Sequence, residues 1–143
     1  MPDTRSLRIF ISYASQDLAS VRTLYQRLKS EPWIEVWFDK ENLLPGQDWN
    51  LEIGKGLRAA DVIIVCLSKE SVAKEGYVQR EFRRAADFAE EKPEGTIYLI
   101  PLRLDDCVTP SKFQQWQWVD YFTDDAYEKL TRSLQIRFES LQS

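Results

Sequence analysis

The sequence predicts an α/β protein in which a parallel β-sheet is covered by helices on both faces. Five short apolar segments alternate along the chain with segments of helical periodicity. The two longest apolar runs, Val62–Leu67 and Ile97–Leu102, are continuous, as expected for strands that are buried on both sides. With 143 residues, 43% hydrophobic and 29% charged, the composition is that of one globular domain, which we place at residues 1–143.

The expected strands are short segments rich in β-branched and aromatic residues, at 7–13, 35–39, 62–67, 96–104 and 118–122. The expected helices carry apolar residues three or four positions apart, at 18–29, 49–60, 78–89 and 124–141, with a short one from Thr109-Pro110. Residues 40–48 contain the turn dipeptide Pro45-Gly46 and are expected to form a loop.

Charge and special residues exclude several classes of function. The net charge is −4 without a basic stripe, which argues against a nucleic acid or a membrane as partner. The first eight residues lack the apolar core of a signal peptide, and two cysteines do not make a disulfide framework, so we expect a cytoplasmic protein. The absence of histidine excludes histidine-based catalytic relays and histidine-ligated metals, and we predict neither a metal site nor a cofactor.

Two nucleotide- or phosphate-linked alternatives fail on their context. Gly54, Gly56 and Ala59 match the string G-x-G-x-x-A, but they lie inside a predicted helix rather than at a strand-to-helix turn. A phospho-acceptor receiver domain needs acids after the first strand and an Asp at the end of the third. The chain has Ser12 and Ser68 at those points.

The strongest candidate site lies at the carboxyl ends of the strands, where parallel sheets bind their ligands. Tyr77 and Glu81 are four residues apart on one helical flank, and the helical phase places Glu81 at the rim of the core. Ser68 and Ser71 supply hydroxyls nearby. The structural alternative is an ordinary ion pair between Glu81 and Arg84.

Aromatic residues gather at the same strand ends: Phe10, Tyr13, Trp37 and Trp49. Core packing is the alternative role for them, and it is the favoured one for Phe10 and Trp37.

Four segments together resemble TIR (Toll/interleukin-1 receptor) domains of the bacterial type. Ile9–Tyr13 with the following Asp17 resembles their first motif, and Asp39–Trp49 resembles their BB loop. Val62–Ser68, followed by Ser71, Gly76, Tyr77 and Glu81, is similar to the third strand and the helix after it, and Trp118–Phe122 is a loose counterpart of the last motif.

The resemblance implies a flavodoxin-like three-layer fold with strand order 2-1-3-4-5. It also implies one of two activities: cleavage of NAD⁺ or a scaffold for contacts between TIR domains. In the enzymatic case NAD⁺ is a substrate rather than a cofactor, Glu81 is the catalytic residue, and the reaction serves immune or cell-death signalling such as antiviral defence. The implied substrate-binding residues are Phe10, Ser12, Tyr13, Asp39, Ser68, Ser71 and Tyr77. The implied self-association surface is the BB loop: Leu44, Pro45, Gly46, Gln47, Asp48 and Trp49.

A single carboxylate suffices for this chemistry because nicotinamide leaves as a neutral group, whereas ordinary glycosides need a second carboxylate to protonate the leaving oxygen. Hydrolase and cyclase both stay open, because both reactions begin from the same cation. The rival function is a non-enzymatic scaffold that binds other TIR domains through its BB loop. A weaker alternative is an NAD⁺ sensor that binds without cleavage.

Overall fold

The computed structural model describes residues 5–38, 44–73 and 77–142. For residues 38, 49, 50 and 77–82 it describes the backbone alone. Asp39 therefore lies outside the described residues, and so do the side chains of Trp49, Tyr77 and Glu81.

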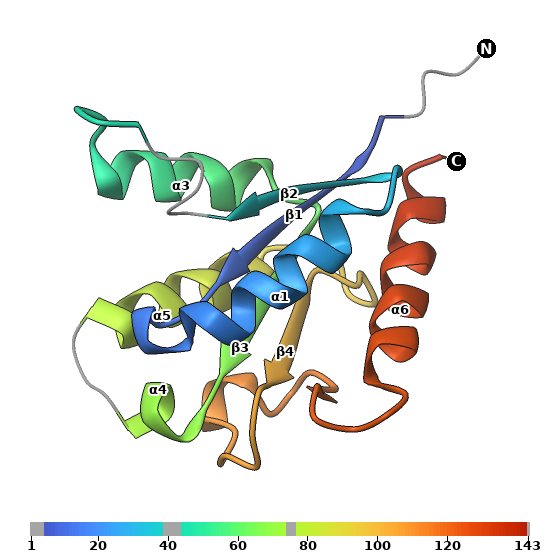
Figure 1. Cartoon of the computed structure of the whole chain (residues 1–143). Helices are drawn as coiled ribbons and strands as arrows, with labels where there is room; N and C mark the ends of the chain where they lie inside the picture. The colour runs from blue at the N-terminus through green and yellow to red at the C-terminus, as the bar shows by residue number, and fades with distance from the viewer. Residues whose placement is uncertain (1–4, 39–43, 74–76, 143) are drawn as a thin grey trace.

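A five-stranded parallel sheet with the order β2-β1-β3-β4-β5 forms the centre of the molecule (Figure 1). Its strands are β1 (Leu7–Ser12), β2 (Ile34–Phe38), β3 (Val62–Leu67), β4 (Leu99–Arg103) and β5 (Val119–Asp120). The helices are η1 (Ser15–Asp17), α1 (Leu18–Lys29), α3 (Trp49–Ala59), α4 (Lys69–Ala73), α5 (Tyr77–Glu90), η2 (Ser111–Phe113) and α6 (Ala126–Ser140). The predicted α/β fold and the strand order implied by the resemblance are both confirmed.

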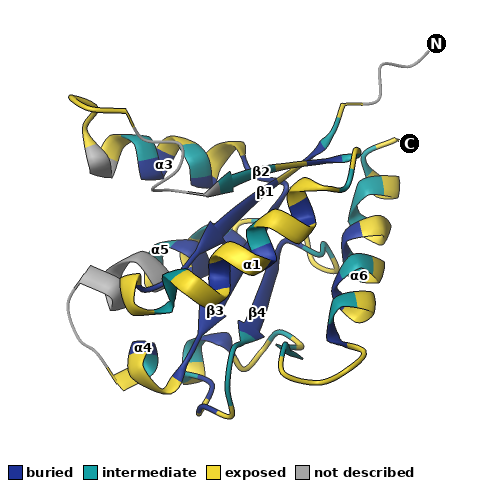
Figure 2. Ribbon diagram, in the orientation of Figure 1, coloured by how far each residue is buried: buried dark blue, intermediate teal, exposed yellow. Residues whose placement is uncertain are grey.

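Two apolar cores lie on the two faces of the sheet. On one face α1 and α6 pack against alternate strand residues such as Ile9 and Ile64, and on the other α3 and α5 pack against residues such as Phe10 and Ile63. Every residue of β3 is buried, as Figure 2 shows for the centre of the sheet. The continuous apolar run of β3 therefore has the predicted cause, which is burial from both sides.

The ends of several elements differ from the sequence prediction. α4 was expected to be loop, but Ser68 caps a short helix there. β5 is shorter than expected and pairs only with Leu102 and Arg103. The predicted helix at Thr109-Pro110 is a 3₁₀ turn, because Pro110 serves as its N-cap rather than its first residue. None of the helices in the described ranges combines the length and apolar character needed to cross a bilayer.

Along β4, the main-chain N–H and C=O groups of successive residues point alternately toward β3 and toward the β5 side, which is the edge of the sheet. The Tyr98 carbonyl accepts a hydrogen bond from the Ile63 N–H (2.7 Å) on the β3 side, and the Arg103 carbonyl accepts one from the Tyr121 N–H (2.9 Å) on the β5 side. Pro101 belongs to the outer set by this alternation. Its ring removes an N–H donor from the outer edge of β4.

The glycines of α3 serve packing rather than nucleotide binding. Asp48 caps the helix by accepting a hydrogen bond from the Leu51 N–H (3.1 Å), so Gly54 and Gly56 lie well inside the helix, as predicted. A Cβ placed on Gly56 would lie 2.8 and 2.9 Å from two ring atoms of Phe10. The missing side chain therefore allows α3 to approach the sheet closely.

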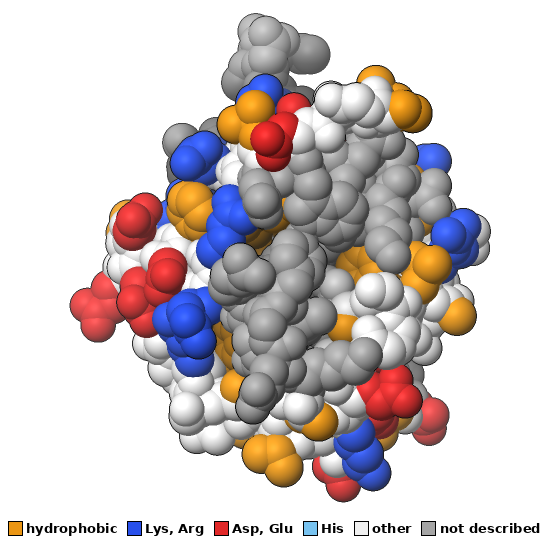
Figure 3. Space-filling model, turned by 90° about the vertical axis from the view of Figure 1, so that its left-hand side faces the viewer, with side chains coloured by type: hydrophobic (Ala, Val, Ile, Leu, Met, Phe, Trp, Pro, Cys, Tyr) orange, Lys and Arg blue, Asp and Glu red, His pale blue; other side chains and the backbone are white. Residues whose placement is uncertain are grey.

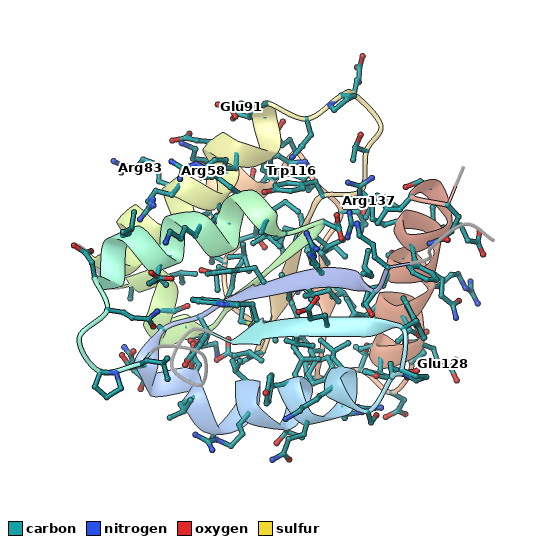
Figure 4. All side chains as sticks on the ribbon, turned by 90° about the horizontal axis from the view of Figure 1, so that it is seen from above. Arg58, Arg83, Glu91, Trp116, Glu128 and Arg137 are labelled. Atoms are coloured by element: carbon teal, nitrogen blue, oxygen red, sulfur yellow. The ribbon has the colours of Figure 1, made fainter. Side chains whose placement is uncertain are left out.

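Asp61 joins the N-terminal arm to the opposite end of the sheet from the candidate site. Its buried carboxylate accepts two hydrogen bonds from the Arg5 guanidinium (2.6 and 2.7 Å) and one from the Arg8 N–H (2.8 Å). Arg137 (labelled in Figure 4) donates to the Asp61 carbonyl at 3.2 Å. Burial raises the pKa of Asp61, but the hydrogen bonds from Arg5 and Arg8 outweigh it and leave this pKa below its ordinary value.

Asp61→Asn is expected to lower the free energy of unfolding at pH 7 by about 1–2 kcal/mol, because the charged hydrogen bonds are weakened while half-exposed Arg5 limits their value. A carboxyl whose native pKa is depressed contributes stability above its unfolded pKa of about 4 and loses it as pH falls through the native pKa. The difference between wild type and variant should therefore shrink between pH 5 and acid. Urea denaturation across this range measures it. An equal difference at every pH would contradict the electrostatic explanation.

Candidate functional site

The first turns of α5 carry the predicted catalytic residue Glu81 and the predicted substrate-binding residue Tyr77. α5 begins at Tyr77, so Tyr77 and Glu81 occupy consecutive turns of a regular helix, as the spacing predicts. This helix follows the carboxyl end of β3 after α4 (Figure 1). The predicted ion pair of Glu81 with Arg84 involves a side chain outside the described ones. Arg84 extends toward α3, where one of its guanidinium nitrogens lies 2.9 Å from where a Cβ on Gly54 would be.

Ser68 and Ser71 form a closed hydrogen-bonded unit at the end of β3. The Ser68 N–H donates to the Ser71 hydroxyl oxygen (2.8 Å), and the Ser71 N–H donates to the Ser68 hydroxyl oxygen (3.1 Å). The Ser71 hydroxyl donates to the Ser68 carbonyl (3.1 Å) and the Ser68 hydroxyl donates to Asp17 (2.8 Å). Both serines are buried. Each hydroxyl hydrogen is therefore already used within the protein, and contact of these serines with a substrate stays a prediction.

Asp17, the last residue of η1, contacts this serine unit through Ser68. It is the N-cap residue of α1, yet its side chain makes no capping hydrogen bond and accepts instead from the Ser68 hydroxyl. Burial raises the pKa of Asp17, and the nearby carboxylates of Asp105 and Glu70 raise it further, while the Ser68 hydrogen bond opposes them. Asp17 entered the sequence analysis only as part of a motif. Asp17 follows β1 and Ser68 follows β3, and these are neighbouring parallel strands. This placement could have indicated that the two residues meet.

Asp105, in the loop after β4, holds the same short helix. Lys69 is the first residue of α4, and its N–H donates to both carboxylate oxygens of Asp105 (3.0 and 3.2 Å). A carboxylate at this end also complements the partial positive charge of a helix N-terminus. The loops after β1, β3 and β4 are thus connected through two acids.

Of the aromatic residues predicted at the strand ends, those with described side chains pack in or against the hydrophobic cores. Phe10 is fully buried and stacks on Trp37, with ring centroids 4.8 Å apart and an interplanar angle of 13°. Ser12 and Tyr13 are also buried. The alternative of core packing therefore describes Phe10 and Trp37 directly. Contact of Phe10, Ser12 and Tyr13 with a substrate stays a prediction. The same holds for Asp39 and for the side chain of Tyr77, which lie outside the described part of the structure.

The described part of the BB loop is a compact exposed turn. The Leu44 N–H donates to the Gln47 side-chain oxygen (2.7 Å), and the Gln47 N–H donates to the Leu44 carbonyl (3.1 Å). Gly46 adopts φ +90°, which other residues rarely do. Leu44 is 66% exposed at the tip. On the face in Figure 3 the described acidic and basic side chains are intermixed.

A sizeable cavity among the described residues lies elsewhere. It has a volume of about 610 Å³ and lies between β4, β5 and α6, with Trp116 (Figure 4), Trp118, Asp120 and Lys129 in its lining. None of the predicted substrate-binding residues contributes to it. The resemblance to TIR domains gave no reason to expect it, and sequence analysis did not find it.

Comparison with known proteins identifies the family. Residues 9–134 match the TIR domain family. No curated protein sequence matches the chain significantly.

Solved structures show the same fold at low sequence identity. A prokaryotic SEFIR domain is 20% identical with a TM-score of 0.67, over 90% of this chain and 98% of that one. The TIR domain of the Toll-related receptor TRR-2 of Hydra magnipapillata is 17% identical with a TM-score of 0.72, over 92% and 97%. The TIR domains of the activated Roq1 resistosome are 19% identical with a TM-score of 0.59, over 94% and 82%. With the family match spanning most of its length and the fold agreeing, the chain belongs to the TIR domain family.

Proposed function

We propose that this TIR domain cleaves the bond between nicotinamide and ribose in NAD⁺, with Glu81 as the catalytic carboxylate. The observation that carries the proposal is the start of α5 at Tyr77. With this start, the backbone positions of Tyr77 and Glu81 fall on consecutive turns of the helix that follows β3 and α4. In the proposal they lie near the carboxyl ends of the strands. This is the edge at which parallel α/β sheets bind their ligands.

The chemistry needs little beyond this carboxylate. Nicotinamide departs as a neutral base, so no acid has to protonate it. The positive charge that develops on the ribose is stabilised by a nearby anion. Glu81 supplies that anion and accepts a hydrogen bond from a ribose hydroxyl. Tyr77 offers an aromatic ring beside the nicotinamide ribose. Water or another nucleophile then captures the cation, which makes the product ADP-ribose or a cyclised isomer.

The network behind α5 supports this assignment. Ser68, Ser71, Asp17 and Asp105 are joined by hydrogen bonds and give the edge of the sheet a rigid backing. An active site works best when its reacting groups are held by such a layer. In this proposal the predicted pocket residues Ser68 and Ser71 act by supporting the site rather than by contacting NAD⁺ with their hydroxyl hydrogens.

The exposed turn at Leu44–Gln47 supports dependence of the activity on self-association. The turn presents an apolar tip that nothing in the described chain covers. In the proposal, the BB loop of one copy completes the site of its neighbour, and NAD⁺ turnover serves immune or cell-death signalling.

The direct test is nicotinamide release from NAD⁺ by the purified chain over a wide range of protein concentration, with chromatographic separation of ADP-ribose from cyclic products. We expect turnover per molecule to rise with concentration. No turnover at any concentration would overturn the proposal. In that case, loss of TIR–TIR binding on changing Pro45 or Gly46 would support a scaffold, and calorimetric NAD⁺ binding without product would support a sensor.

Gly46→Ala is expected to move the concentration dependence of turnover to higher protein concentration. The φ of +90° costs a residue with a side chain about 1–2 kcal/mol, so the turn rearranges. Sedimentation velocity and nicotinamide release at several concentrations measure the shift.

Gly95→Ala is the matched control, because Gly95 also has a positive φ (+86°) with open space around it but lies after α5, far along the chain from the BB loop. Equal shifts in both variants would mean that the BB-loop turn is not the associating surface.

A further inference from the structure

We propose that Asp17 is a positioning residue for the candidate site, holding α4 through Ser68 and thereby the point at which the chain enters α5. The inference rests on the proposed NAD⁺ cleavage. It adds to the site a residue of η1, after β1, which acts on the site through its hydrogen bond with Ser68.

The Asp17 carboxylate bonds across the fold rather than to its own helix. Asp17 ends η1, which runs directly into α1, and its φ of −93° and ψ of 5° are not the extended geometry of a capping residue. The carboxylate makes no capping bond and accepts a hydrogen bond from the Ser68 hydroxyl, 51 positions along the chain, at 2.8 Å. That bond orients the Ser68 oxygen to receive the Ser71 N–H (3.1 Å), so the cap of α4 depends on the carboxylate.

α4 is too short to hold itself in place. It spans five residues, Lys69–Ala73, and helices of this length are not stable in isolation. Two side chains from other loops fix its first turn, Asp17 through Ser68 and Asp105 through the Lys69 N–H. α4 also contacts η1, which ends at Asp17. Removing Asp17 leaves only one of the two anchors.

The position of α4 matters because α5 begins four residues after α4 ends. Tyr77 and Glu81 lie in the first two turns of α5, so a displaced α4 displaces the start of the helix that carries them. Misplacing reacting groups by about 1 Å costs up to 10²-fold in rate. The distal half of α5 is held by buried Ala85 and Ala86, so the effect stays local.

Three variants of the intact chain test the role. Asp17→Ser keeps a small polar side chain where η1 meets α1, but the serine is too short to reach Ser68 as the carboxylate does. Asp17→Asn keeps an acceptor oxygen at the same reach without the charge. Glu70→Gln, on the exposed side of α4, removes a neighbouring negative charge and leaves the serine unit intact. We expect kcat to fall about 10- to 100-fold in Asp17→Ser, by less than about 3-fold in Asp17→Asn, and to be unchanged in Glu70→Gln.

Two further measurements separate positioning from a general loss of stability. Amide hydrogen exchange should accelerate about tenfold at Ser71 and Val72 in Asp17→Ser, while the β3 amides keep their protection. The double variant Asp17→Ser/Ser68→Ala should be no slower than Ser68→Ala alone, because Asp17 acts through Ser68.

The outcomes are distinct. If the wild type releases no nicotinamide, the proposed function falls, and with it the catalytic part of this inference. If the wild type is active and Asp17→Ser is equally active, or if α4 exchange is unchanged, the positioning role is overturned while the proposed function stands. An Asp17→Asn variant as slow as Asp17→Ser would also overturn it, since the charge or proton of Asp17 would then be what the reaction needs.

Discussion

Replacing Glu81 by alanine is expected to reduce NAD⁺ cleavage by roughly 10²- to 10³-fold, the usual effect of removing one group that stabilises transition-state charge. The reason is that Glu81 is the proposed source of the negative charge that balances the positive ribose, and the chain has no histidine to substitute. The measurement is the initial rate of nicotinamide release at saturating NAD⁺, with the KM determined separately.

Two companion variants make this result specific. Glu81→Gln keeps the size and hydrogen-bonding capacity and should be nearly as slow as Glu81→Ala, because the charge is what acts. Glu90→Ala removes an exposed acid from the same helix and should leave the rate unchanged. If Glu81→Ala matches the wild type, Glu81 is not the catalytic residue and its role reduces to a surface ion pair.

Gly56→Ala should destabilise the fold by roughly 2–3 kcal/mol. The added Cβ would lie under 3.0 Å from two ring atoms of Phe10 and 3.4 Å from Trp37. Phe10 is fully buried and stacked on Trp37, so its ring cannot shift without disturbing the packing around it. Chemical denaturation monitored by tryptophan fluorescence measures the change in the free energy of unfolding.

Gly54→Ala is the natural control, two positions away in the same helix. Its new Cβ would lie 2.9 Å from the Arg84 guanidinium, the far end of a flexible side chain that can shift. Alanine also favours the helix by about 1 kcal/mol over glycine. We expect this variant to be as stable as the wild type or more so. Equal losses in the two variants would show that close packing on Phe10 is not what Gly56 provides.

Sequence periodicity predicted the fold well because the helices of this protein are amphipathic against two separate cores. The residues at 21, 24 and 28 of α1, and at 53 and 57 of α3, are buried as their spacing indicates. β3 was recognised because burial on both faces removes every polar residue from it. The strand order came from the family resemblance, since it depends on crossovers that no local pattern records.

The candidate site was less predictable. α4 was missed because its stability comes from Asp17 and Asp105, which are distant in sequence, rather than from helical periodicity. The serines were predicted to offer hydroxyls to a ligand, whereas their hydrogens are used within the protein. Which hydroxyl is already occupied depends on tertiary contacts, so residue types at strand ends indicate only the region of a site.

The short β5 strand has a consequence for how copies of this domain can meet. It leaves the outward-facing main-chain groups of Leu99 without a strand partner among the described residues, although Leu99 itself is buried beside the segment before β5. Unpaired strand edges are where identical chains can join into intermolecular sheets. Pro101 removes a donor from that edge and so interrupts the template. By removing that donor, Pro101 weakens the pairing that a strand from another copy could make there. In a domain proposed to work in assemblies, this would favour contacts between side chains over shared sheets.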